Sequence, residues 1–371
     1  MKEIFLRINQ YLLFIVLLTV LLYFGKSFLI PLVFAAMLAM LMAPVCRKVD
    51  SWGAHRAISS LVCILILAGV VVGMGAIIGA QFSAFAEDID QIKSKGKELV
   101  AQAQGYIQEK SGVTPEEQET AVKEQAENAK KSAGGAAAGL LAGITSAIAG
   151  IVLSLVFTFL FLFSKEKYEE FFLKLYRDED TDKVKKVVGQ ISNVAQRYLT
   201  GRAMSITIIA ILYSIGLSIV GIKNAILLAG IAALLTVIPY VGTVLGGLFP
   251  VMMALVTEDS YQPALMAALV MFIIQTLDNY FIEPNIVGGE VNLSALVSIL
   301  SIIAGGMIWG VAGMILFLPM VGIIKIICDH VEPLKPLGFV VGDPAGKRAS
   351  KLSEWIKSKF SKGKSNPRRR S

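Results

Sequence analysis

Residues 58–78 read ISSLVCILILAGVVVGMGAII and contain no Asp, Glu, Lys or Arg. A helix needs about 20 apolar residues to cross the hydrocarbon core of a bilayer, so this stretch predicts a transmembrane helix. Helix is favoured over strand because lipid offers no hydrogen-bond partner to exposed backbone groups.

Similar runs recur along the chain, which excludes a single membrane anchor. The clear runs cover 11–30, 140–163, 203–221 and 263–282, and shorter or interrupted runs cover 32–45, 225–256 and 293–328. The composition agrees, because 55% of the 371 residues are hydrophobic and 17% are charged, which is more apolar than a soluble domain of this size requires. We therefore predict an all-α, polytopic integral membrane protein with about eight membrane segments, two of them broken or hairpin-like, plus an extramembrane helical insert.

Positive charge indicates the side of the membrane on which each loop lies. Arg47, Lys48 and Arg56 fall between the second and third runs, and residues 164–202 contain nine Lys or Arg. Both loops should therefore be cytoplasmic. Residues 82–135 contain ten acids against seven lysines and should lie on the opposite face. Both termini are then cytoplasmic, in a multi-pass protein of the bacterial inner membrane.

The formal net charge of +7 belongs to the C-terminal tail. Residues 346–371 carry ten Lys or Arg and one acid, so the rest of the chain is slightly acidic. Apolar residues, among them Trp355 and Phe360, recur at helical spacing between these basic residues. This pattern favours an amphipathic segment lying on anionic membrane lipid over a nucleic-acid partner.

These patterns divide the chain into six regions. We expect N-terminal transmembrane helices in 1–81, an extracytoplasmic helical insert in 82–137, a transmembrane helix in 138–164, a cytoplasmic amphipathic helix in 165–202, a transmembrane transport core with broken helices in 203–330, and a basic cytoplasmic tail in 331–371. The insert shows an apolar seam and a capping box at 114–117, which predict two helices. They form either a solvated hairpin or an element for subunit contact or gating.

The first candidate site is a break in the apolar run 225–256. Proline removes a backbone donor and glycine lowers helix stability, so the helix should break around Pro239, Tyr240, Gly242, Thr243 and Gly246. Breaks of this kind form the midplane binding sites of many secondary transporters. The same residues could instead make a plain turn between two short helices.

The second candidate site is a polar cluster at the end of the run 263–282, formed by Gln275, Asp278, Asn279 and Glu283. A carboxylate inside a span costs about 2.5 to 3.5 kcal/mol on insertion scales, so Asp278 should face a cavity or a partner. It could bind a coupling proton or sodium ion, with Gln275 and Asn279 offering hydrogen bonds to a solute or a neighbouring helix. Alternatively, Asp278 caps the helix at its aqueous end.

The third candidate site is a second break, marked by Gly305, Gly306, Gly310 and Pro319. The apolar run here is too long for one span, and it echoes the break around Pro239. Paired interruptions are typical of transporters built from related halves. Glycines can equally serve close helix packing.

Motifs for enzymatic or metal chemistry are missing from the sequence. There is no GxxxxGK[ST] phosphate loop, no HExxH and no GxSxG, and His55 and His330 are the two histidines. Three scattered cysteines, Cys46, Cys63 and Cys328, form no paired metal motif. We expect no enzymatic activity, no metal site and no cofactor.

Three segments resemble the autoinducer-2 exporter family. They are Ile238–Gly242 with Gly246 downstream, the segment Asp278–Gly288 that includes Glu283 and Pro284, and the stretch from Gly305 to Pro319. The resemblance covers nearly the whole chain and implies a helical transporter of about eight membrane segments. It implies a homo-oligomer, with a pentamer as one option, and an elevator-like or gated hairpin mechanism.

The resemblance also bears on the substrate. Members of the family are associated with export of the small hydroxylated furanone autoinducer-2, and others with sodium/proton antiport. Many members carry a His-Pro pair or a similar pair after the glycine region, whereas this chain reads Leu293-Ser294-Ala295-Leu296. Fold-level likeness therefore leaves the substrate open.

Three functions follow from these patterns, in descending order. The first is secondary or facilitated export of a small polar solute along the broken segments, with Asp278 coupling to a cation. The second is sodium/proton antiport with Asp278 and Glu283 as ion ligands. The third is an envelope scaffold whose insert binds a partner.

Overall fold

The computed structural model of the protein describes residues 2–87, 145–175, 181–239, 241–258, 260–286 and 293–343, with the single residues 94, 98, 101 and 143. Within these ranges every regular element is a helix, apart from one isolated bridge between Leu293 and Gly342. The all-α prediction is confirmed.

The described helices, in chain order, are α1 (Lys2–Phe24), α2 (Lys26–Asp50), α3 (Arg56–Glu87), an unlabelled helix Thr145–Phe163, α6 (Lys165–Leu175), α7 (Thr181–Val220), α8 (Ala225–Leu235), α9 (Val241–Thr257), α10 (Tyr261–Leu277), a π-helical segment η1 (Asp278–Ile282), α11 (Glu283–Ile286), α12 (Ala295–Trp309), α13 (Val311–His330), a 3-10 turn η2 (Glu332–Leu334) and α14 (Lys335–Val341). In the described part of the chain, six helices are long and apolar enough to cross a membrane. This confirms a polytopic membrane protein.

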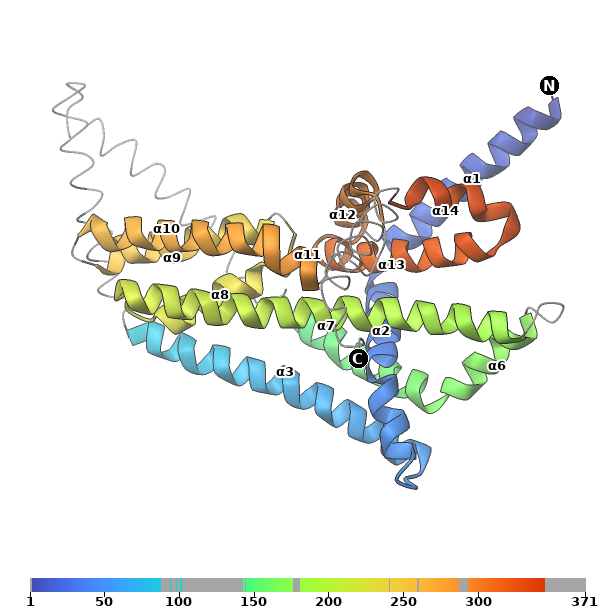
Figure 1. The fold of residues 1–371 in the computed structure, drawn as a ribbon, viewed down its shortest axis with the longest axis horizontal. Helices are drawn as coiled ribbons and strands as arrows, with labels where there is room; N and C mark the ends of the chain where they lie inside the picture. The colour runs from blue at the N-terminus through green and yellow to red at the C-terminus, as the bar shows by residue number, and fades with distance from the viewer. Residues whose placement is uncertain are drawn as a thin grey trace, which may run out of the picture.

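Helix α7 is the helix against which many of the others pack. In Figure 1 it runs through the molecule, with α8, α9 and α10 along one half and α6 and α13 beside the other, and α14 packs on α13. The helices α8 and α9 pack against each other as one hairpin, and α12 and α13 pack as a second. We call these hairpin 1 and hairpin 2. Both therefore lie against the same long helix.

Small residues let hairpin 1 pack closely against α7 and α10. Its core is a buried cluster rich in alanine, including Ala229, Ala232 and Ala233 of α8, Ala254 of α9 and Ala267 of α10. Alanine side chains allow close approach of helix backbones, which is the ordinary basis of helix association in membranes.

Hairpin 2 is built on a glycine contact. A Cβ on Gly305 would collide with the carbonyl oxygen of Gly313, and a Cβ on Gly313 would collide with that of Gly305. The turn between the two helices lies at Gly310, whose positive φ of 61° suits glycine. The break predicted at Gly305–Pro319 is therefore a turn at Gly310, and Pro319 lies buried inside α13.

The first apolar run differs from its prediction. The sequence suggested one run over 11–30, but α1 ends at Phe24 and α2 begins at Lys26. Gly25, which favours helix poorly, sits at the break, where a Cβ would lie 2.6 Å from the carbonyl oxygen of Leu21. Helix α2 then continues through Pro31 and Pro44 to Asp50.

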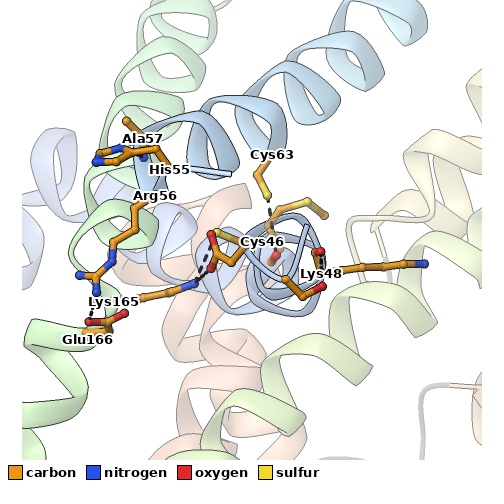
Figure 2. A network of polar contacts seen from close by, with 11 residues as sticks. Cys46, Lys48, His55, Arg56, Ala57, Cys63, Lys165 and Glu166 are labelled. Atoms are coloured by element: carbon orange, nitrogen blue, oxygen red, sulfur yellow. Dashed lines mark hydrogen bonds and ion pairs between the residues drawn. The ribbon is translucent and has the colours of Figure 1, made fainter. Parts of the chain in front are cut away.

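The two loops predicted to be cytoplasmic meet at one end of the molecule. Figure 2 shows the turn between α2 and α3 beside the start of α6, where Arg56 pairs with Glu166 at 2.5 Å and Lys165 pairs with Asp50. Burial alone would lower the pKa of the Lys165 ammonium, but its hydrogen bond to Asp50 and the neighbouring Cys46 thiol together raise it. The start of each loop therefore lies at the same end of the molecule, and their cytoplasmic side stays a prediction.

Two predicted regions fall largely outside the described residues. These are the insert at 82–137, with its apolar seam and capping box, and the part of the predicted 331–371 tail that follows Asp343. The start of that tail is described and forms η2 and α14. Of the amphipathic segment predicted at 165–202, residues 165–175 and 181–202 are described. Its larger part is continuous with the following span, because α7 runs unbroken from Thr181 to Val220.

Candidate functional site

The break of hairpin 1 lies where the sequence placed it. Helix α8 ends at Leu235, α9 begins at Val241, and the turn between them contains Thr236 and Pro239. The glycines after the turn permit close contact, because a Cβ on Gly246 would lie 2.7 Å from the carbonyl oxygen of Ala232. Gly242 likewise packs against the backbone of Leu235, and Thr243 is half-buried beside it. Tyr240 lies outside the described residues.

Asp278 is buried at the point where α10 becomes π-helical. Its side chain is 3% exposed, which argues against a cap at the aqueous end of the helix. The backbone N–H of Glu283 donates to the carbonyl of Asp278, the i to i+5 bond of a π-helix. In an α-helix these two residues would stand about 140° apart, whereas the π-helical turn brings them to the same side of the helix. Single π-helical turns occur often at functional sites.

Helix α7 supplies the neighbour of Asp278. The hydroxyl of Ser205, which is fully buried, lies 3.5 Å from Oδ1 of Asp278. A buried carboxylate needs such partners because burial without them is costly. The site therefore forms between α7 and the end of α10.

Arg202, one turn before Ser205 on α7, joins the polar segment to hairpin 1. Its Nη2 donates to the carbonyl oxygen of Thr236 in the hairpin turn, and its Nη1 lies 3.4 Å from Oε1 of Glu283. The Arg202 side chain is 14% exposed and that of Glu283 is 47% exposed. One guanidinium thus holds both the turn and a carboxylate next to Asp278.

The other predicted polar residues differ in burial, because Gln275 is half-buried and Asn279 is exposed. Gln275 accepts a hydrogen bond from the hydroxyl of Tyr213 at 3.1 Å and donates one to Asn279 at 3.0 Å. Asn279 is exposed, so the four polar residues do not share one inward face. The backbone of Pro284 lies in α11, within a turn of Glu283.

The glycines of hairpin 2 lie apart from Asp278. Hairpin 2 packs on α1, α2 and α7, and Nε1 of Trp309 at its tip donates to the carbonyl of Leu22 at 2.9 Å. The hydroxyl of Tyr198, one turn before Arg202, donates to the carbonyl of Ile315 in α13 at 3.1 Å. Adjacent turns of α7 therefore contact the two hairpins.

Sequence reasoning missed three residues of this arrangement, namely Tyr198, Arg202 and Ser205. Arg202 carried a usable signal, because a cation beside a span needs a partner and Asp278 and Glu283 are two of the acids in or next to a span. Tyr198 and Ser205 carried none, since such residues are common in membrane helices. Among the described residues, no group of three or more His, Cys, Asp or Glu could hold a metal ion.

Comparison with known proteins gives a family match over most of the chain. A family model described as AI-2E family transporter matches residues 12–332. The chain is 31% identical over 140 residues to YueF of Bacillus subtilis, which is named as a candidate transport protein, and the match covers 38% of this chain and 37% of YueF. It is 32% identical over 113 residues to the AI-2 transport protein TqsA of Escherichia coli, covering 30% of this chain and 33% of TqsA. Each match spans less than half the length of the curated relative.

Proposed function

This chain belongs to the AI-2E transporter family, and on that premise we propose that it exports a small polar metabolite such as autoinducer-2 by a secondary or facilitated mechanism. Membership makes the chain a membrane transporter. The name of the relative TqsA supports autoinducer-2 as the first solute to test.

The observation that carries the proposal is the link from a buried carboxylate to a helix break. Asp278 is 3% exposed in a span, Glu283 follows it across one π-helical backbone bond, and Arg202 connects Glu283 to the turn of hairpin 1. Buried carboxylates within spans are typical of proton or ion relays.

The coupling step is a change of charge at Asp278. When Asp278 takes up a proton or sodium ion, the local negative charge that holds the Arg202 guanidinium falls. Arg202 then holds the Thr236 carbonyl less firmly, and the turn of hairpin 1 is free to move. A bound cation thereby favours the conformation in which solute can pass.

Tyr198 extends this coupling to hairpin 2. Because Tyr198 and Arg202 lie one turn apart on a rigid helix, a shift of α7 at Arg202 also moves the contact between Tyr198 and Ile315. Both hairpins would then respond to the state of one carboxylate, as expected of paired broken segments in transporters.

The second candidate function is sodium/proton antiport. The π-helical turn that places Glu283 on the same side of the helix as Asp278 favours it, because two neighbouring carboxylates can exchange a proton for a sodium ion without an organic solute. In this case Asp278 and Glu283 are the ion ligands and Arg202 sets their affinity.

Proteoliposomes loaded with autoinducer-2 distinguish these functions. Efflux and internal pH are followed with and without an imposed proton or sodium gradient, for wild type and Asp278→Asn. Glu332→Gln is the matched control, because Glu332 is an exposed carboxylate outside the network. Export predicts gradient-sensitive efflux that is lost in Asp278→Asn and kept in Glu332→Gln.

The other outcomes are equally clear. Proton exchange driven by sodium, without efflux of autoinducer-2, would replace export by antiport. Equal efflux from wild type and Asp278→Asn would remove Asp278 from the mechanism.

A further inference from the structure

An open pocket of about 520 Å³ lies between the start of α2 and the tip of hairpin 2. Its walls include Tyr23, Lys26 and Ser27 on one side and Gly306, Trp309 and Gly310 on the other. Hairpin 2 is one of the two segments proposed to form the solute path, so a pocket at its tip is placed where solute would bind.

Lys26 gives this pocket its charge. Among the described residues that line it, Lys26 is the one charged side chain, and no acid faces it there. The ammonium lies 5.0 Å from the centre of the Tyr23 ring, and the side chain is exposed. A positive pocket without an acid disfavours a cationic solute and favours an anionic one.

The opposite wall offers hydrogen-bond acceptors. Helix α12 ends at the pocket, and the N–H of Gly310 bonds back to the carbonyl of Gly306 at 3.0 Å. The carbonyls of a last helical turn generally lack intrahelical partners. Their partial negative charge repels the anionic group of a solute, so that group has to lie at Lys26 and only neutral hydroxyls can approach α12. These carbonyls accept hydrogen bonds from hydroxyl groups.

We propose that this pocket binds a small hydroxylated organic anion. Its carboxylate or phosphate oxygens pair with Lys26, and its hydroxyls donate to the carbonyl end of α12. This assignment rests on the proposed export function, because it names the class of solute that hairpin 2 handles.

The position of the pocket along α2 indicates the side of the membrane to which it opens. Lys26 begins α2 and Asp50 ends it, so the pocket lies at the opposite end of α2 from the turn that we predict to be cytoplasmic. An exporter would release its solute from such a pocket to the extracytoplasmic side.

Trp309 makes binding measurable without a transport assay. The chain has three tryptophans, so Trp52→Phe with Trp355→Phe leaves Trp309 in the pocket wall as the one fluorophore of this kind. The variant is placed in phosphatidylcholine nanodiscs and titrated with glycerate, propionate and glycerol. Glycerate should change Trp309 fluorescence at the lowest concentration, because it alone has both the carboxylate and the hydroxyls.

Two lysine variants test the charge. Lys26→Met should weaken glycerate binding by about tenfold or more, since it removes a charge-assisted contact. Lys26→Arg should retain binding, and Lys48→Met, an exposed lysine at the other end of α2, should leave it unchanged. Equal binding of glycerol and glycerate, or glycerate binding unaffected in Lys26→Met, would overturn the inference.

Lipid is the other source of oxyanions. If phosphatidylglycerol in the nanodisc, and not glycerate, changes Trp309 fluorescence in a manner that depends on Lys26, the pocket is a headgroup site and the solute assignment is wrong. The fluorescence titration needs no ion gradient and no transport. If glycerate does not bind, the pocket assignment is wrong, and the proposed export function is still tested separately by the efflux assay. Loss of efflux with intact glycerate binding would instead count against export.

Discussion

Arg202 is the residue on which the proposed coupling depends. It contacts the Thr236 carbonyl and Glu283 together, while its own side chain is 14% exposed. Because a buried guanidinium has few alternative partners, losing either contact leaves a polar group unsatisfied. That makes Arg202 a more sensitive position than the half-exposed Glu283.

Replacing Arg202 with Gln should therefore affect both stability and transport. The uncharged side chain loses the ion pair and leaves the Thr236 carbonyl poorly satisfied, which should cost about 1–3 kcal/mol of stability. We expect a lower melting temperature in detergent and a reduced rate of efflux. Arg47→Gln, an exposed arginine on α2, is the control. Wild-type stability and efflux in Arg202→Gln would show that the contact is incidental.

The sequence predicted the acids of this site but not their partners. Asp278 was found because a carboxylate in a span is rare. Ser205 and Tyr198 could not be found, since their roles depend on which helices pack beside α7. The π-helical turn that brings Glu283 to the same side of the helix as Asp278 has no signature in the local residue pattern.

Glycine pairs decide how tightly each hairpin closes. In hairpin 2, a Cβ on Gly305 meets the backbone of Gly313, whereas a Cβ on Gly306 meets the flexible end of Met314 at 2.7 Å. Gly305 therefore faces backbone atoms, whereas its neighbour Gly306 faces a flexible side chain.

Gly305→Ala should destabilise the protein where Gly306→Ala does not. Forcing two backbones apart typically costs about 1–3 kcal/mol, whereas a methionine can change rotamer at little cost. Melting temperatures of the two variants in the same detergent check this. Equal melting temperatures would contradict a close backbone contact in hairpin 2.

The junction of α2, α3 and α6 gives a prediction with a defined pH range. Because the pKa of Lys165 is raised in the folded protein, the pair with Asp50 contributes stability below the unfolded pKa of about 10.4 and loses it as pH rises through the folded value. The melting-temperature difference between wild type and Lys165→Met should be equal at pH about 7 and about 9, then shrink above about 10.4. Lys167→Met, an exposed lysine of α6, should show no such change.

At the level of elements, the apolar runs predicted the spans and both breaks. Two features escaped prediction. The division at Gly25 escaped because apolar residues flank it on both sides, and the continuity of α7 escaped because charge density changes within one helix. Hydropathy indicates whether a segment lies in lipid or in water. It does not indicate the residue at which a helix begins or ends.

The exposed side chain of Asn279 bears on the oligomeric state of the protein. Asn279 is exposed on the candidate span Tyr261–Ile282. An amide facing lipid is unfavourable, so a second copy of the chain would cover it better. This supports the homo-oligomer implied by the family resemblance.

Light scattering of the purified protein should accordingly give a mass of more than one chain. Asn279→Leu should shift the distribution toward smaller species, because it removes an interhelical hydrogen-bonding group. Phe272→Leu, an exposed apolar exchange on the same helix, should not. A monomeric wild type would contradict the prediction.

In the whole molecule, two hairpins pack against one long helix, α7. Hairpin 1 contacts α7 at Arg202 and hairpin 2 contacts it at Tyr198. The sequence predicted both hairpins, but their relation through adjacent turns of α7 required the three-dimensional arrangement.

The most direct test of this account is the accessibility of the hairpin 1 turn as Asp278 changes charge. Ile238→Cys is labelled with a membrane-impermeant maleimide in proteoliposomes at several pH values, with and without Asp278→Asn, and Ser51→Cys in the distant α2–α3 turn is the control site. Maleimide reacts with the thiolate, so acid pH slows labelling at every exposed cysteine, and the rate at Ile238→Cys is therefore divided by the rate at Ser51→Cys at the same pH. The account predicts that this ratio rises at acid pH in the wild-type background and is high at every pH with Asp278→Asn. Labelling of Ile238→Cys that is the same with and without Asp278→Asn at each pH would contradict it.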